Sequence, residues 1–220
     1  LPYVVWIILY CALTWGIFGA LLGAVTPSLR AQMDVSFQQM GWLMAIWSAG
    51  GAIGSLLGGA IAKRFPPRRL LRVYTAAVVL ALAGVLLAPS FAWLAFFMVT
   101  IATFETALFT VGHGLLAEMS DEPEQRTRII SLVDVAYSLG TMFSPLMAAA
   151  VLLASPSWRG PYGVFGFMAL VMLVLTLQRR RLRTVAFRSD PVQMTATGQP
   201  RLHLGYAGLL RQPVVRWVLF

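Results

Sequence analysis

The sequence predicts an all-α membrane protein with six transmembrane helices and the start of a seventh. Three observations support this fold class: 59% of the 220 residues are hydrophobic, only 11% are charged, and the mean hydropathy is +0.76. A soluble domain of this length carries about 25% charged residues. The apolar residues gather in runs of about 20, which is the length that crosses a hydrocarbon core of roughly 30 Å as a helix.

Turn-forming and charged residues divide the apolar runs into separate helices, because such residues are typical of loops. The breaks contain Thr26-Pro27 with Asp34, Lys63 to Arg69, Pro89-Ser90, Glu118 to Glu124, and Ser155 to Ser157. The predicted transmembrane helices span residues 3–27, 40–62, 70–88, 91–116, 129–154 and 161–177.

The composition divides the chain into three regions. Residues 1–177 hold the six-helix transmembrane bundle, residues 178–213 are Arg-rich and then polar, and residues 214–220 start the seventh helix. The middle region is predicted to be a cytoplasmic linker. Its run from Arg179 to Arg183 either anchors the sixth helix or binds anionic lipid headgroups. Since the sequence starts without Met and ends in an apolar run, we expect both ends to continue in a longer chain.

The distribution of basic residues predicts the orientation. All Lys and Arg except Arg30 and Arg159 fall on one side of the predicted bundle, and cytoplasmic loops retain basic residues during insertion. We therefore expect a multi-pass protein of the cell membrane with a cytoplasmic amino terminus. The same asymmetry explains the net charge of +9 without a nucleic-acid partner, since the sequence has no recognisable nucleic-acid module.

Residues that carry enzyme chemistry are scarce. Cys11 is the only cysteine, and His113 and His203 fall in unrelated segments, so a zinc site built on paired thiolates is excluded. The sequence shows no nucleophile with a neighbouring base and no phosphate-binding loop. We expect no catalytic site, no metal and no cofactor, and therefore no enzyme.

Glycines form a stripe on the second predicted helix and lead into a basic loop. Gly50, Gly54 and Gly58 follow G-x-x-x-G spacing, which lets another helix approach closely in lipid. The next residues, 59–69, read GAIAKRFPPRR and carry Gly59, Arg64, Arg68 and Arg69.

The fifth predicted helix carries a second short motif. Residues 140–149 read GTMFSPLMAA, with Gly140, Ser144 and Pro145 as small or helix-bending positions. Small side chains permit close packing, and a proline frees a backbone carbonyl and permits a bend where helices must slide.

These motifs resemble two signatures of the major facilitator superfamily, G-x-L-a-D-R-x-G-R-R in the loop between helices 2 and 3 and G-x-x-x-G-P-x-x-G-G on helix 5. Lys63 and Pro66 stand where the first signature has an acidic residue and Gly. The resemblance implies the amino-terminal six-helix half of a transporter, built as two three-helix repeats, with a substrate site near the midplane. It also implies a second six-helix half, a small-molecule solute, protons and membrane lipids as partners.

Two subfamilies are favoured within that superfamily. No Lys or Arg lies between Phe91 and Leu116, while Glu105 lies there and Ser138-Leu-Gly140 follows on the next helix. This pattern is similar to that of fucose-permease-type transporters. The helix-5 motif is also common in drug exporters.

Glu105 is the first candidate for a proton-binding or substrate-binding group. It lies about 14 residues, or roughly 21 Å, from the outer end of the fourth helix, and Phe109 falls on the same helical face. An ionised side chain at mid-membrane costs roughly 2.5 to 3.5 kcal/mol, and a desolvated carboxylate can load and release protons near neutral pH. In the alternative interpretation, Glu105 is bonded to Thr103, Thr106 or a backbone carbonyl.

Three further residues are candidates for the same site. Asp134, near the inner end of the fifth helix, either relays protons or forms an interfacial ion pair with Arg126, Arg128 or a helix-4 group. His113, near the inner end of the fourth helix, either takes part in proton transfer or simply meets water. Trp15 on the first helix either lines a cavity for sugar rings or apolar solutes, or packs against lipid.

The predicted function is secondary active transport of a small solute by alternating access, coupled to protons through Glu105. One alternative is a multidrug efflux antiporter. The other is a non-transporting membrane scaffold or receptor with the same fold, which would not need an acid at mid-membrane.

Overall fold

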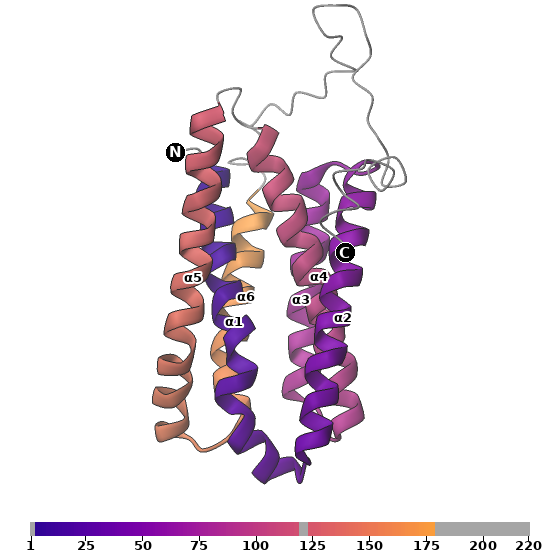
Figure 1. Ribbon diagram of the computed structural model, residues 1–220, viewed down its shortest axis with the longest axis vertical. Helices are drawn as coiled ribbons and strands as arrows, with labels where there is room; N and C mark the ends of the chain where they lie inside the picture. Colours follow the sequence, from indigo (N-terminus) through magenta and orange to yellow (C-terminus); the bar gives the residue numbers. More distant parts are fainter. Residues whose placement is uncertain (1–2, 119–122, 179–220) are drawn as a thin grey trace, which may run out of the picture. The chain divides into compact units, whose positions relative to one another are not determined.

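A computed structural model describes residues 3–118 and 123–178, and these residues form six α-helices. Successive helices run in opposite directions along a common axis (Figure 1). All six are long and apolar enough to cross a membrane, which confirms the all-α membrane fold class. The predicted linker, its Arg179 to Arg183 run and the seventh helix lie outside the described residues. The helices are α1 (Tyr3–Met33), α2 (Phe37–Ala62), α3 (Pro67–Leu86), α4 (Phe91–Glu118), α5 (Pro123–Ala154) and α6 (Arg159–Leu177).

The predicted end of the first helix at Pro27 is wrong, because α1 continues through Pro27 to Met33. A proline inside a membrane helix removes one backbone bond, and nearby hydroxyl groups help to satisfy the freed groups. Here the Thr26 hydroxyl donates to the Leu22 carbonyl over 2.7 Å, next to the Gly23 carbonyl that Pro27 leaves without its backbone donor. The chain turns only at Asp34, whose φ of 51° is a left-handed conformation that Asp tolerates.

Four helices, α2, α3, α5 and α6, begin earlier than predicted, and local chemistry explains the starts of α2 and α5. Ser36 caps α2 in a reciprocal capping box with Gln39, which satisfies two backbone donors at the helix end. Pro123 is the first residue of α5 and Glu124 lies in its first turn. Proline is favoured at that position since its missing N–H needs no partner there, and an acid is favoured at the positive end of the helix.

The six helices pack as two groups of three, and neither group consists of three consecutive helices. α1 packs with α5 and α6, while α4 packs with α2 and α3, and the two groups lie side by side in Figure 1. If α1 is exchanged with α4, α2 with α5 and α3 with α6, one group becomes the other. Each group therefore contains helices from both three-helix repeats.

The two motifs with small residues supply equivalent contacts in the two groups. A Cβ added at Gly54 on α2 would overlap the backbone of Thr103 on α4, and one added at Gly140 on α5 would overlap the Leu13 carbonyl on α1. Small residues permit such close backbone approach. The stripes with small side chains thus fasten α2 to α4 and α5 to α1 within the bundle.

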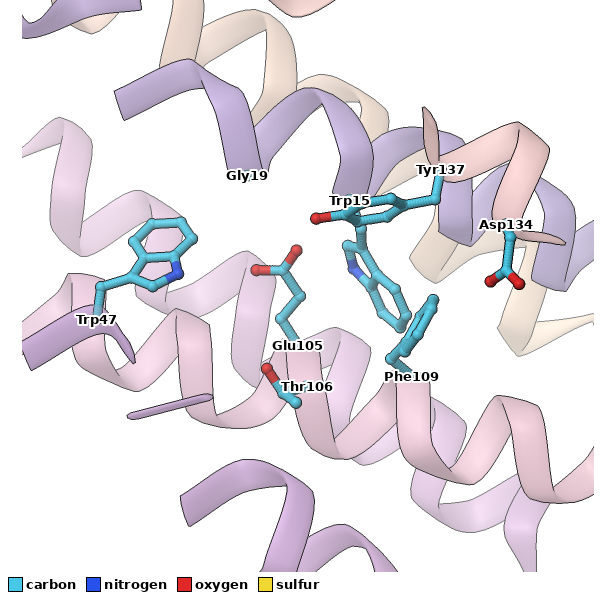
Figure 2. A pocket seen from close by; sticks show the side chains of 8 residues that line it. All are labelled: Trp15, Gly19, Trp47, Glu105, Thr106, Phe109, Asp134 and Tyr137. Atoms are coloured by element: carbon cyan, nitrogen blue, oxygen red, sulfur yellow. The ribbon is translucent and has the colours of Figure 1, made fainter. Parts of the chain in front are cut away.

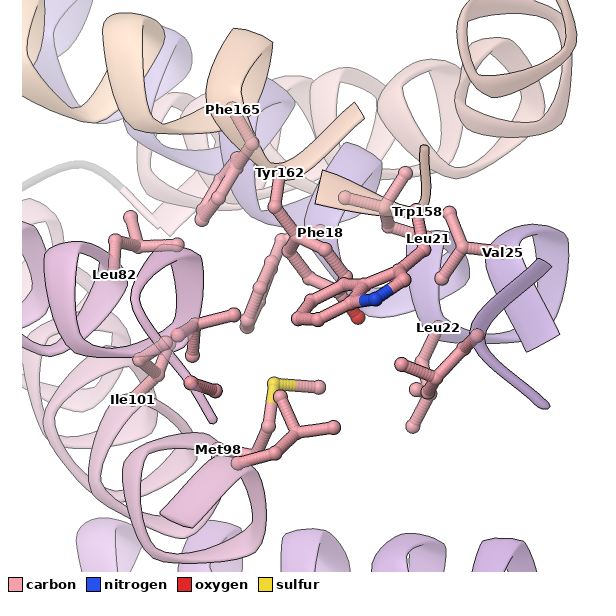
Figure 3. Close-up of a cluster of buried hydrophobic side chains, with 14 of the residues drawn as sticks. Phe18, Leu21, Leu22, Val25, Leu82, Met98, Ile101, Trp158, Tyr162 and Phe165 are labelled. Atoms are coloured by element: carbon pink, nitrogen blue, oxygen red, sulfur yellow. The ribbon is translucent and has the colours of Figure 1, made fainter. Parts of the chain in front are cut away.

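A hydrophobic cluster fills the space between the two groups near one end of the bundle. Phe18 on α1 stacks on Phe165 on α6, with ring centroids 4.3 Å apart, and meets Tyr162 edge-on at 6.1 Å. Met98 and Leu82 come from the other group and are fully buried in the same cluster (Figure 3). This cluster closes the end of the bundle at which α3 ends and α6 begins.

Arg159 ties α6 to the end of α3 at this closed end. Its Nε donates to the Leu86 carbonyl over 2.9 Å, and its Nη2 donates to the Ala88 carbonyl over 2.7 Å. The guanidinium lies 4.6 Å from the ring centroid of the buried Trp158. A cation that binds the free carbonyls at a helix end stabilises that end.

Candidate functional site

A cavity of about 390 Å³ lies between α1, α2, α4 and α5. The cavity lies near the middle of these helices, farther from the closed end of the bundle than the hydrophobic cluster. Figure 2 shows its side chains converging from opposite walls. The cavity is lined by Trp15, Gly19, Trp47, Glu105, Thr106, Phe109, Asp134 and Tyr137.

Glu105 occupies the centre of this cavity. Its side chain projects from α4 into the space between the groups (Figure 2), and the residue is only 8% exposed. The alternative contact to Thr103 is not formed, since the Thr103 hydroxyl donates to the Val99 carbonyl over 2.8 Å. Within residues 3–118 and 123–178, no hydrogen bond or ion pair satisfies the carboxylate.

The cavity lining is acidic as well as aromatic. Glu105 and Asp134 contribute carboxylates, and none of the eight lining residues is Lys or Arg. Taking an unpaired carboxylate out of water costs several kcal/mol. A proton or a cationic group that enters the cavity removes part of that cost, whereas an anion adds to it.

Four of the eight residues that line the cavity are aromatic. Trp15 and Phe109 meet edge-on with centroids 5.3 Å apart, and Phe109 lies 6.1 Å from the ring of Tyr137. Trp15 is 5% exposed, so it faces the cavity and not the lipid. Rings in this arrangement offer flat apolar faces for a solute.

Sequence reasoning missed Gly19, Trp47 and Tyr137, and it named Thr106 only as a possible partner of Glu105. Tyr137 is three residues after Asp134 and shares its face of α5. The period of the helix could therefore have predicted that Tyr137 lies in the same site as Asp134. Trp47 is three residues before Gly50 on the stripe that faces α4. Gly19 leaves room for the Tyr137 hydroxyl, which would be 3.1 Å from an added Cβ.

His113 and Asp134 link α4 to α5 at the edge of the cavity. His113 Nε2 lies 3.9 Å from Asp134 Oδ1, and its Nδ1 lies 3.1 Å from the Phe109 carbonyl. The side chain of Asp134 is 66% exposed and that of His113 is 26% exposed. Asp134 therefore pairs with a helix-4 group, one of the partners that the sequence left open, and the pair lies between Glu105 and the solvent-exposed edge.

The residues of the first motif lie away from the cavity. Gly59 belongs to the last turn of α2, Arg64 lies in the turn that follows, and Pro66 precedes α3 as its N-cap residue. The Arg69 guanidinium lies 5.8 Å from the ring centroid of Phe65. The side chain of Arg68 is outside the described part of the structure.

The residues of the second motif lie between α5 and α1. The buried Ser144 donates a hydrogen bond to the Ile17 carbonyl on α1, and Gly140 abuts Leu13 one turn away. Pro145 lies inside α5 without ending it. These residues hold the helix pair that carries Trp15 and Tyr137 into the cavity.

Six membrane-length helices in two interleaved repeats, with an unpaired acid in a cavity at mid-helix, form the architecture of one half of a secondary transporter. The chain belongs to the Major Facilitator Superfamily, whose sequence profile matches residues 5–220.

The individual proteins that the chain resembles share less than a quarter of its residues over the matched region. The chain is 24% identical over 167 residues to a Protein TsgA homolog of Citrobacter koseri, covering 74% of the chain and 42% of that protein. It is 23% identical over 167 residues to Protein TsgA of Escherichia coli, with the same coverage. The chain thus spans less than half the length of these curated relatives.

A solved structure shares the fold. The crystal structure of a D-xylose-proton symporter superposes with a TM-score of 0.67 at 17% sequence identity. The match covers 83% of this chain and 50% of the symporter. The bundle therefore has the fold of half of that molecule.

Proposed function

We propose that this chain is the amino-terminal half of a secondary active transporter that moves a small solute by alternating access, coupled to protons at Glu105. One observation carries the proposal. Glu105 is buried at the centre of an aromatic cavity and has no partner among the described residues.

Proton binding at Glu105 links the charge of the cavity to its access state. An ionised carboxylate is costly when the cavity is sealed from water and tolerable when water enters. Protonation therefore favours a sealed state, and deprotonation favours an open one. A carrier that must be protonated to close over its solute couples the two movements.

His113 and Asp134 provide the route by which protons reach Glu105. His113 follows Phe109 by one turn of α4, and Phe109 follows Glu105 by one turn. The pair joins this stripe to an exposed carboxylate on α5. We assign Asp134 and His113 to proton exchange with water, and we assign Trp15 and Phe109 to contact with the solute.

The second half of the transporter closes the cavity from the other side. α2 and α5 are the least buried helices of the bundle, and they expose apolar side chains such as Leu56 and Met142. We propose that six further helices cover the parts of these surfaces that border the central cavity, after the linker at 178–213 and the start of a seventh helix at 214–220. Gly59, Arg64, Arg68 and Arg69 would control this contact at the basic end, while Gly140, Ser144 and Pro145 let α5 tilt.

The orientation follows from the ends at which the basic residues lie. Lys63, Arg64 and Arg69 lie at one end of the bundle, and Arg30 and Arg159 lie at the other. Arg30 Nε donates to the Val35 carbonyl over 3.0 Å, so both exceptions are used as backbone caps. We propose that the first end is cytoplasmic in the cell membrane, in accord with the retention of basic loops.

The test uses the complete protein in proteoliposomes with an imposed pH gradient. Neutral sugars, beginning with D-xylose, are the first probes for uptake. Glu105→Gln is expected to abolish accumulation driven by the gradient while solute exchange at equal pH continues, since the amide fills the same space without titrating. Accumulation that survives unchanged in Glu105→Gln would refute the coupling role.

A multidrug efflux antiporter is the second candidate. The acidic and aromatic cavity without Lys or Arg in its lining also suits an apolar organic cation, which rings attract through their negative faces. Tetraphenylphosphonium is the matching probe, and its efflux against a proton gradient would favour this candidate. A scaffold or receptor would show no flux of either probe.

A further inference from the structure

A second cavity of about 390 Å³ lies on the outer side of α1 and α5. It is lined by side chains that are almost all apolar. The exceptions carry one polar atom each: the indole of Trp6, and the hydroxyl of Tyr10, which donates to the Met168 carbonyl over 3.1 Å. The lining residues, hereafter the outer groove, are Trp6, Leu9, Tyr10, Leu13, Leu132, Val135, Ala136 and Leu139.

The outer groove faces away from the central cavity. Asp134 and Tyr137 line the central cavity, while Leu132, Val135 and Leu139 each lie two residues from one of them on α5. Two residues correspond to about 200° around a helix of 3.6 residues per turn. The two cavities therefore lie on opposite faces of α5, with the contact to α1 between them.

The outer groove runs parallel to the helices. Its α5 residues span positions 132–139 and its α1 residues span positions 6–13, which is about 10 Å along each of these two parallel helices. A straight hydrocarbon chain in a bilayer lies in the same direction. The groove thus matches an acyl chain in both direction and polarity.

A cation lies at the end of this groove. Arg128 precedes Leu132 by one turn and falls on the same stripe of α5, and its side chain is exposed. Glu124 lies one further turn away, and no ion pair joins it to Arg128 within the described ranges. The guanidinium is therefore available to an anion, and its planar fork suits a phosphate.

We propose that the outer groove binds one acyl chain of an anionic phospholipid whose phosphate is held by Arg128. The exposed Trp6 ring lies near the same end of the groove, where indole rings favour the headgroup level of a membrane. This lipid site is independent of the transport proposal, because it needs only the α1 and α5 pair. A protein partner is disfavoured, since an apolar slot that ends in one unpaired guanidinium complements a lipid with an acidic headgroup.

Native mass spectrometry of the complete protein tests the site. Phosphatidylglycerol and phosphatidylcholine with identical acyl chains are added to the protein in detergent. We expect phosphatidylglycerol to be retained preferentially, and we expect Arg128→Gln to lower its retention roughly tenfold, the size of one charge-assisted hydrogen bond. Arg69→Gln, which removes a cation at the same end on α3, is the matched control and should retain the lipid.

A second variant tests the groove itself. Ala136→Phe places a ring among the lining residues and should reduce the retention of both lipids. Equal retention of the two lipids, or an Arg128→Gln protein that binds like the parent, would overturn the proposal. Retention of no lipid by the parent protein would overturn it as well, since the second half of the protein would then cover the groove. The melting temperatures of the variants show that each has folded.

Discussion

The hydroxyl oxygen of Ser144 on α5 lies 2.5 Å from the Ile17 carbonyl oxygen on α1, to which it donates a hydrogen bond. Both helices carry cavity residues, since Trp15 lies half a turn before Ile17 and Tyr137 lies two turns before Ser144. The contact therefore sets how the two walls of the cavity meet.

Substitutions at Ser144 should separate size from hydrogen bonding. Ser144→Ala keeps a small side chain and is expected to cost about 0.5 to 1.5 kcal/mol. Ser144→Leu is expected to destabilise the bundle further, because the residue is fully buried and a larger side chain would push α5 from α1. Thermal unfolding in detergent measures both, and a Leu variant as stable as the Ala variant would contradict the close contact.

Arg159 should be important for stability although it is only the first residue of α6. Arg159→Gln removes two hydrogen bonds to the carbonyls at the end of α3, which is expected to cost about 1 to 3 kcal/mol. Unfolding titrations in mixed micelles measure the loss. Arg64→Gln is the control, since Arg64 lies at the other end of the bundle, and a similar loss there would contradict a specific role for Arg159.

Trp15 should matter for solute binding and Trp6 should not. Trp15 is buried against the cavity, whereas Trp6 is 60% exposed on the outside of the same helix. In proteoliposomes, Trp15→Ala is expected to raise the KM for solute roughly tenfold, the equivalent of about 1.4 kcal/mol. Trp6→Ala should leave KM unchanged. An equal effect of both substitutions would indicate a loss of folding and not of binding.

The pair formed by His113 and Asp134 should affect the speed of proton coupling more than its existence. Asp134→Asn is expected to slow gradient-driven accumulation several-fold, because the exchange of protons with water becomes slower. Accumulation at steady state should persist, in contrast to Glu105→Gln. If His113→Gln and Asp134→Asn together slow the rate no more than either one alone, the two residues act as one unit.

Water should reach the central cavity but not the core. Cys11 is 3% exposed, and its thiol lies 3.3 Å from the Met172 sulfur, so the parent protein should resist a charged thiol reagent. Thr106→Cys should react because Thr106 lines the cavity, and added solute should protect it. Leu108→Cys is the matched control, since Leu108 is 1% exposed. If Leu108→Cys reacted, water would reach the buried core, contrary to this prediction.

The helix count and Glu105 could be predicted from the sequence because lipid imposes strict rules on a chain. Every crossing needs a long apolar run, and an acid within such a run is costly enough to stand out. The end of α1 could not be predicted in the same way. Proline usually ends a helix in water, but α1 passes through Pro27 because membrane helices have no competing solvent for the backbone.

The aromatic partners of Glu105 were harder to predict because contacts between helices depend on how far each helix is rotated. Trp47 and Tyr137 lie on apolar helices on which nearly every face carries hydrophobic residues, so periodicity alone does not separate a cavity wall from a lipid-facing surface. The pairing of α1 with α5 and of α2 with α4 decides which rings turn inward. That pairing is a property of the assembled bundle.

The exchange of helices between the two groups has a consequence for biosynthesis. As the ribosome delivers the chain in order, α1 enters the membrane long before α5, and α2 waits for α4. Gly16 can meet Tyr137, and Leu13 can meet Gly140, only after the fifth segment has been inserted. A nascent chain of three segments therefore has no finished subdomain to adopt, and quality control should recognise it as incomplete until the later segments arrive.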